Sequence, residues 1–142
     1  MLFWIILAIV VAFAIYVRVA PSDAARWHKQ AQPAGVEPVK LTKGYIWRKV
    51  VEGDGSAELA ALTAVAEADP RTTVLAGSAA DGQVTFISRT AVIGFPDYTT
   101  MGIYTMPDGT RYLEAYGRLR FGRSDLGVNT KRIKGWLAAA QL

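Results

Sequence analysis

The first twenty residues constrain this chain more than any other segment, because they form a nearly uninterrupted apolar run. No charged side chain occurs from Leu2 to Val17. Extended to Ala20, the run would give about 28 Å of helix at 1.5 Å per residue. That length is close to the hydrocarbon core of a bilayer, about 30 Å. We therefore predict a transmembrane helix over residues 1–20, stopped by Pro21.

A cleaved signal peptide is the alternative interpretation of this run. It is disfavoured because no basic segment precedes the apolar residues and because residues 17–20 make a poor small-x-small cleavage site. The cationic side chains Arg18, Arg26 and Lys29 follow the run, so the positive-inside rule favours a cytoplasmic position for the rest of the chain. We expect a single-pass protein of the inner (plasma) membrane.

The rest of the chain divides into a linker and one domain. Residues 21–43 carry Pro21, Pro33 and Pro38 and show no sustained helical or alternating pattern, so we expect an irregular, partly extended linker. Residues 44–142 number about 100, close to the commonest size of a single domain. One small soluble domain should therefore follow the transmembrane helix.

Hydrophobic patterning and turn residues predict the element order β-α-β-β-β-β-α in this domain. The expected strands are residues 45–51, 73–75, 83–89, 98–106 and 111–121, and the expected helices start at Ser56 and at Ser124 or Asp125. Asp81-Gly82 and Pro107-Asp108-Gly109 predict tight turns between antiparallel strands. We expect an α+β fold with two layers, in which both helices pack on the apolar face of an antiparallel sheet.

The strand predicted over residues 111–121 has two chemically different faces. Its apolar residues alternate with polar and aromatic ones, which are Tyr112, Glu114, Tyr116, Arg118 and Arg120. Successive side chains of a strand point to opposite faces. The sheet should therefore bury one face under the helices and carry a polar, aromatic surface on the other.

The residue inventory argues against common catalytic and metal sites. The chain has no cysteine, and His28 is its only histidine, close after the apolar run. Thiolate nucleophiles, cysteine-based metal sites and a Ser-His-Asp triad inside the domain are therefore excluded. No phosphate-loop or dinucleotide fingerprint occurs either. We expect no metal, no cofactor and no enzymatic activity.

The most basic part of the domain runs from Arg118 to Lys134 and surrounds the predicted start of the last helix. Arginine side chains and the free N–H groups of a helix N-terminus can together hold a phosphate or carboxylate. The alternative is structural, with Ser124 or Asp125 capping the helix. The candidate binding residues here are Arg118, Arg120, Arg123, Ser124, Asp125, Asn129 and Arg132.

The segment Phe95-Pro96-Asp97-Tyr98 allows two interpretations. It can be a fixed turn in which Asp97 accepts backbone hydrogen bonds. Alternatively, Asp97 joins a charged cluster on the polar face of the sheet, formed with Ser88, Arg89 and Arg118. A carboxylate between arginines stays ionised and is a poor general acid, so this cluster would bind a ligand or partner rather than catalyse hydrolysis.

Several segments resemble the "domain of unknown function 1499" family of membrane-anchored bacterial and plastid proteins. They are residues 16–28, Phe95-Pro96-Asp97-Tyr98 and residues 122–129, followed by Arg132 and Trp136. The resemblance covers nearly the whole chain and implies the same membrane-anchored architecture. It implies no catalytic residue.

These observations favour a non-catalytic interaction protein, an accessory or assembly subunit of an inner-membrane complex such as an energy-transducing one. The alternatives are a lipid- or small-anion-binding module and a hydrolase using Asp97 or Asp125. The whole chain, which we expect to be tethered to a membrane, has a net charge of +4 at pH 7. Anionic lipid headgroups or an acidic partner surface therefore explain that charge better than nucleic acid does.

Overall fold

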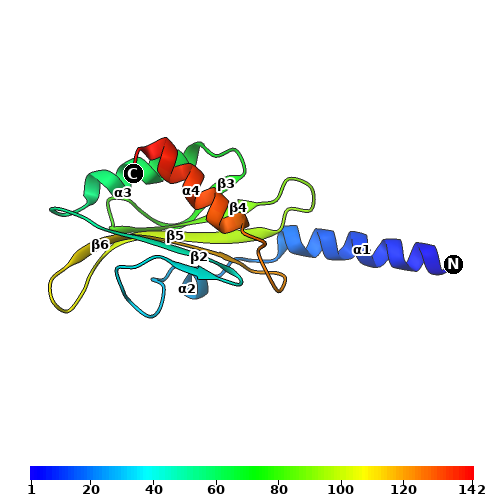
Figure 1. The fold of residues 1–142 in the computed structure, drawn as a ribbon. Helices are drawn as coiled ribbons and strands as arrows, with labels where there is room; N and C mark the ends of the chain where they lie inside the picture. The colour runs from blue at the N-terminus through cyan, green and yellow to red at the C-terminus, as the bar shows by residue number, and fades with distance from the viewer.

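The computed structural model describes all residues from 1 to 142 (Figure 1). The helices are α1 (Leu2–Val19), α2 (Ala24–Trp27), α3 (Ser56–Ala68) and α4 (Val128–Ala140). The strands are β1 (Val39–Leu41), β2 (Gly44–Val50), β3 (Thr72–Ser78), β4 (Gln83–Arg89), β5 (Pro96–Thr105) and β6 (Arg111–Leu119). Apart from α2 and β1, which were not predicted, the order is the expected one.

The strands form one antiparallel sheet in the order β1-β2-β6-β5-β4-β3. The predicted turns connect β3 to β4 and β5 to β6. Gly82 and Gly109 occupy them with φ angles of 78° and 89°, which a residue with a side chain rarely adopts. The predicted α+β class with an antiparallel sheet is confirmed.

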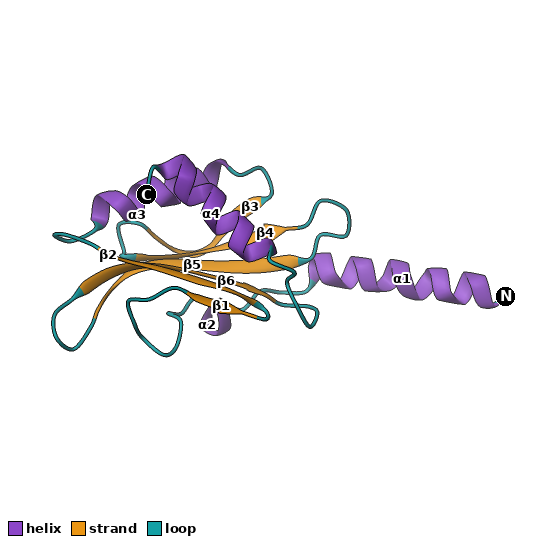
Figure 2. Ribbon diagram, viewed as in Figure 1, coloured by secondary structure: helices purple, strands orange, loops and turns teal.

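Helices α3 and α4 lie together on one face of the sheet (Figure 2). Leu59 and Leu62 of α3 are fully buried, as are Met101 and Leu113 of the two central strands, and Ile133 of α4 is 1% exposed. These side chains belong to a single hydrophobic cluster. The apolar face of the last strand therefore builds the core, as its alternation predicted.

Both domain helices begin differently from the prediction. The residue that precedes each helix is a glycine in the left-handed conformation, Gly55 for α3 and Gly127 for α4, rather than a serine or aspartate. Ser56 is the first helical residue, and its hydroxyl donates to Asp54 at 2.7 Å. Asp125 still acts as a cap, because its carboxylate accepts the N–H groups of Gly127 and Asn129 at 3.0 and 3.1 Å.

The polar face of the sheet is covered by residues 20–38 (Figure 2). The ring of Trp27 stacks on that of Tyr98, with 3.9 Å between centroids, and the Trp27 carbonyl accepts a hydrogen bond from Thr100 at 3.1 Å. Ala31 is fully buried and donates its N–H to the Glu114 carboxylate at 2.9 Å. The predicted linker is mostly irregular, as expected, but residues 20–38 pack against the sheet and are part of the fold. We call residues 20–38 the covering segment.

A buried ion pair holds the second half of this layer in place. Arg48 Nε donates to Glu114 Oε2 at 2.8 Å, with side chains 4% and 1% exposed. The same guanidinium donates to the carbonyl of Pro33 at 2.7 Å and to that of Glu37 at 3.3 Å. The pair therefore connects β2 and β6 to the covering segment.

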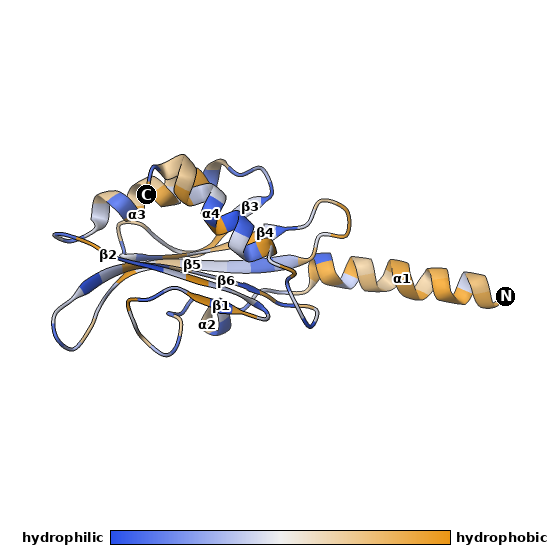
Figure 3. Ribbon diagram, viewed as in Figure 1, coloured by the Kyte–Doolittle hydropathy of each residue, from blue (hydrophilic) through white to orange (hydrophobic).

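Helix α1 is the one helix long and apolar enough to cross a membrane. It extends away from the end of the sheet and is hydrophobic along its length (Figure 3). Its last turns contact two loops of the domain, because Phe13 lies 6.1 Å from Phe95 and 6.3 Å from Phe121 between ring centroids. Tyr16 also lies 6.1 Å from Phe121. The end of α1 thus packs against the loops β4–β5 and β6–α4.

Gly117 provides a test of how closely α4 packs on the sheet. A Cβ at this position in β6 would lie 2.8 Å from Asn129 Oδ1 and 3.0 Å from Ile133 Cδ1. We expect Gly117→Ala to lower the free energy of unfolding by about 1–3 kcal/mol, because α4 must move outward. Gly135→Ala is the matched control, since a Cβ there meets no atom within 4 Å and alanine favours the helix. Denaturation curves in which both variants are equally stable would contradict this packing.

Candidate functional site

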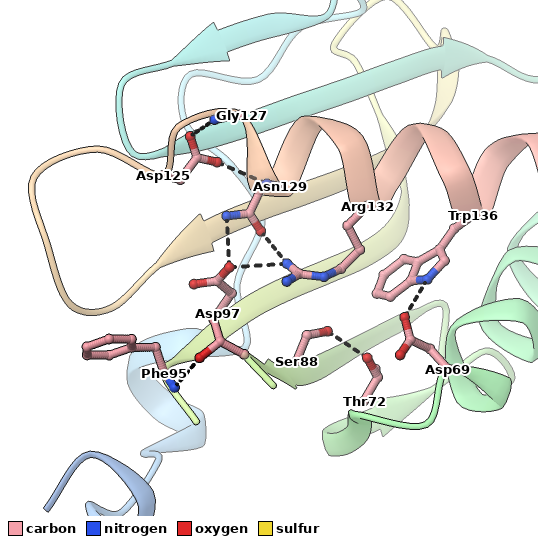
Figure 4. Close-up of polar contacts among 11 residues, drawn as sticks. Asp69, Thr72, Ser88, Phe95, Asp97, Asp125, Gly127, Asn129, Arg132 and Trp136 are labelled. Atoms are coloured by element: carbon pink, nitrogen blue, oxygen red, sulfur yellow. Dashed lines mark hydrogen bonds and ion pairs between the residues drawn. The ribbon is translucent and has the colours of Figure 1, made fainter. Parts of the chain in front are cut away.

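A polar cluster joins the start of α4 to β5 at the end of the sheet nearest α1. Asp97 Oδ2 accepts hydrogen bonds from Asn129 Nδ2 at 3.3 Å and from Arg132 Nη1 at 3.2 Å (Figure 4). Arg132 also donates to Asn129 Oδ1 at 2.9 Å. Together with the cap formed by Asp125, these bonds fix the first turn of α4 on the central strands.

The cluster is closed to ligands. Asn129 is fully buried, and Asp97 is only 6% exposed. Burial raises the pKa of Asp97 above its usual value, and this effect outweighs the opposing influence of the Arg132 charge. The interpretation that places Asp97 between several arginines is wrong, since Arg132 is its one ionic partner. The arrangement supports a structural role in holding α4.

The raised pKa of Asp97 predicts a pH effect on stability. A carboxyl whose pKa is higher in the folded state favours folding when protonated, so its contribution falls as the pH rises from 3.8 through the folded-state pKa. Asp97→Asn should remove this dependence. We expect the stability of the wild type relative to Asp97→Asn to decrease from pH 4 to pH 7 in urea denaturation. A relative stability that increases over this range would contradict the pKa shift.

Arg118 lies on the opposite face of the sheet from Asp97. In the β5–β6 register, Asp97 pairs with Leu119, whereas Arg118 pairs with Tyr98. Because facing residues share a side and neighbours alternate, Asp97 and Arg118 point away from each other. The alternative interpretation, in which Asp97 forms a cluster with Arg118, is therefore wrong, although Ser88 does pair with Asp97.

The guanidinium of Arg118 is used inside the fold. It donates to the carbonyl of Trp27 and, at 3.0 Å, to Thr100 Oγ1, and it lies 4.3 Å from the ring centroid of Tyr116. Burial lowers its pKa to about 10, so it remains protonated at neutral pH. Arg120 similarly donates to the carbonyl of Pro21 at 2.9 Å. Both arginines hold the covering segment on the sheet.

The basic residues from Arg118 to Lys134, predicted to form one surface, therefore lie on both faces of the sheet. Arg118 and Arg120 hold the segment on the polar face, whereas Arg132 lies with Asp97 on the helical face. The part that stays open to solvent contains Arg123, Ser124, Lys131 and Lys134.

A second basic site lies where the domain meets α1. A pocket of about 450 Å³ is lined by three arginines, Arg18, Arg71 and Arg89, and by Pro70, Thr73, Thr90, Ala91 and Gly94. Arg89 Nη1 donates to the carbonyl of Gly94 at 2.9 Å and to that of Val17 at 3.3 Å. No carboxylate lines this pocket. Its positive charges are therefore not neutralised locally.

Sequence reasoning found only part of this pocket. Arg89 was a candidate binding residue, whereas Arg18 had been considered only for membrane topology and Arg71 was not singled out. The position of Arg18 at the end of an apolar run could have indicated a site at the membrane boundary. No local pattern marks Arg71, which follows Pro70 in the turn after α3.

Residues 18–139 match the model of a family described as "Protein of unknown function (DUF1499)". The chain belongs to this family. The match begins at Arg18 and thus includes the covering segment as well as the sheet and helices, which agrees with their packing as one unit. Comparison of this DUF1499 protein with curated proteins gave no match.

Proposed function

We propose that this DUF1499 protein is a non-catalytic, membrane-anchored interaction protein, an accessory or assembly subunit of an inner-membrane complex. The observation that carries the proposal is the docking of residues 20–38 on the sheet. Arg89, Arg118 and Arg120 each donate to a carbonyl of the chain between Val17 and Trp27. The domain therefore holds a defined orientation relative to α1.

A fixed orientation suits a subunit that contacts a partner inside and outside the bilayer. A flexible tether only raises the local concentration of a domain, whereas a rigid connection lets both surfaces engage at once without further loss of conformational freedom. The two carboxylates that a hydrolase would need, Asp97 and Asp125, are buried and accept hydrogen bonds within the fold, which argues against hydrolysis. An energy-transducing complex is the kind of partner we favour.

The domain is proposed to lie on the cytoplasmic side. Arg18, Arg26 and Lys29 lie at the end of α1 or within about 15 residues of it, which is the range over which the positive-inside rule counts charge. A C-terminal green fluorescent protein fusion should fluoresce, because this reporter matures in the cytoplasm. A dark green fluorescent protein fusion with an active alkaline phosphatase fusion would place the domain on the other side.

The proposed subunit role is tested by purification from native membranes. The natively expressed, C-terminally tagged chain should migrate in a discrete large complex after solubilisation in a mild detergent. Mass spectrometry of that band should identify membrane proteins in fixed stoichiometry with it. A single small band at native expression levels, without co-purifying subunits, would contradict the subunit role.

A further inference from the structure

We propose that the pocket formed by Arg18, Arg71 and Arg89 binds the phosphate of an anionic phospholipid at the membrane surface. This inference rests on the proposed membrane anchoring but not on the subunit role. Three guanidinium groups line one pocket without a carboxylate. Guanidinium groups form charge-assisted hydrogen bonds to phosphate oxygens, often in pairs.

Two of the three arginines are already positioned by the backbone. Arg18 donates to the carbonyl of Val92, and Arg89 donates to the carbonyls of Val17 and Gly94. Carbonyl oxygens orient a guanidinium without neutralising it, and each guanidinium carries five N–H donors. Both arginines therefore keep donors for a ligand. Arg71 makes no side-chain hydrogen bond in the structure and is free to close on a bound phosphate.

Gly94 is required for this arrangement. It has a φ angle of 83°, and a Cβ there would lie 3.1 Å from both Cγ and Nε of Arg18. The glycine thus lets Arg18 cross the β4–β5 loop at close range. The end of α1 and the loop form one wall of the pocket, which holds the pocket at the level of the last turn of α1.

The surroundings of the pocket favour a lipid over a soluble anion. Val92 is 81% exposed and Ile93 is 40% exposed in the loop that lines the pocket. Phe95, at the end of the same loop, lies against Phe13 of α1. Phe13 precedes the end of α1 by about 9 Å of helix. The acyl chain of a lipid can therefore lie along these apolar side chains while its phosphate occupies the pocket. A soluble phosphate has no acyl chain and cannot make these apolar contacts.

The proposal is tested with the full chain in a mild detergent containing equal amounts of phosphatidylglycerol and phosphatidylcholine. Native mass spectrometry should show preferential retention of phosphatidylglycerol. Arg71→Gln should reduce that retention about tenfold, the effect of losing one charge-assisted hydrogen bond. Arg111→Gln is the matched control, because it removes the same charge from an exposed arginine outside the pocket. It should retain phosphatidylglycerol like the wild type.

Three outcomes would overturn the proposal. Equal retention of both lipids, or an equal loss in Arg71→Gln and Arg111→Gln, would show that the pocket does not select an anionic headgroup. Displacement of phosphatidylglycerol by millimolar inorganic phosphate would identify a site for soluble anions instead. Lipid retention and the subunit role can fail separately, because the Arg71→Gln protein can also be tested for migration in the native complex.

Discussion

Replacing Glu114 with alanine is expected to lower the free energy of unfolding by about 3–5 kcal/mol, because it leaves the charge of Arg48 buried without a partner. The Arg48 side chain is 4% exposed and cannot reach water without moving the segment that covers it. The Glu114 carboxylate also accepts the N–H of Ala31, so that group loses its partner too. The unpaired Arg48 charge and the unpaired Ala31 N–H both lie where the covering segment meets the sheet, so both weaken the same contact.

The Glu114 prediction is checked by thermal unfolding of the full chain in detergent. A loss of this size should lower the melting temperature by about 12 °C or more for a domain of about 100 residues. Glu52→Ala, at an exposed position, should change it little. The double variant with Arg48→Met and Glu114→Leu should recover most of the stability, because it removes both buried charges. A Glu114→Ala protein as stable as Glu52→Ala would contradict the buried pair.

Replacing Trp27 with alanine should make the covering segment detach from the sheet more often. Trp27 is the last residue of α2; its side chain stacks on Tyr98 of the sheet and its ring lies 5.6 Å from the Arg118 guanidinium. Truncating a buried tryptophan costs about 3–5 kcal/mol. Hydrogen bonds from Pro21, Ser22, Trp27, His28, Gln30 and Ala31 to the rest of the domain remain, so the loss should raise the fraction of molecules in which the segment is open rather than release it completely.

Limited trypsin digestion measures this detachment. Arg26 and Lys29 are exposed side chains on a docked backbone, so the wild type should be cut slowly after them. The Trp27→Ala protein should be cut much faster at the same sites while its sheet and α3–α4 core remain protected. Glu37→Ala, an exposed position in the same segment, serves as the control. Equal cleavage rates in all three proteins would mean that Trp27 does not hold the segment.

Local patterns predicted most of the fold. The strand over residues 83–89 and the turn at Pro107-Asp108-Gly109 follow from alternation and turn chemistry, which depend on neighbouring residues only. Strand β1 was missed because its three residues are too few to show a pattern. It forms by pairing Val39 with Ile46 at the edge of β2.

The positions of the candidate site residues could not be predicted, because they depend on contacts between residues far apart in sequence. The basic residues from Arg118 to Lys134 are neighbours in sequence, yet the two-residue period of β6 and the start of α4 distribute them over both faces of the sheet. Arg18, Arg71 and Arg89 are far apart in sequence and converge only where α1 meets the ends of β3 and β4. The covering segment docks through backbone carbonyls, which every residue carries, so its composition indicated only irregular structure.

The proposed membrane anchoring and the proposed lipid site together require that the loop between β4 and β5 lies at the bilayer surface, and this contact can be measured directly. The chain has no cysteine, so Val92→Cys and Asp108→Cys each introduce a unique spin-label site. Residue 92 lies in the loop beside α1, and residue 108 lies in the β5–β6 turn at the other end of the sheet (Figure 1). In lipid nanodiscs, the label at residue 92 should be accessible to oxygen and shielded from a water-soluble nickel chelate, with the reverse at residue 108. Equal exposure of both labels to the nickel chelate would show that the domain does not rest on the membrane.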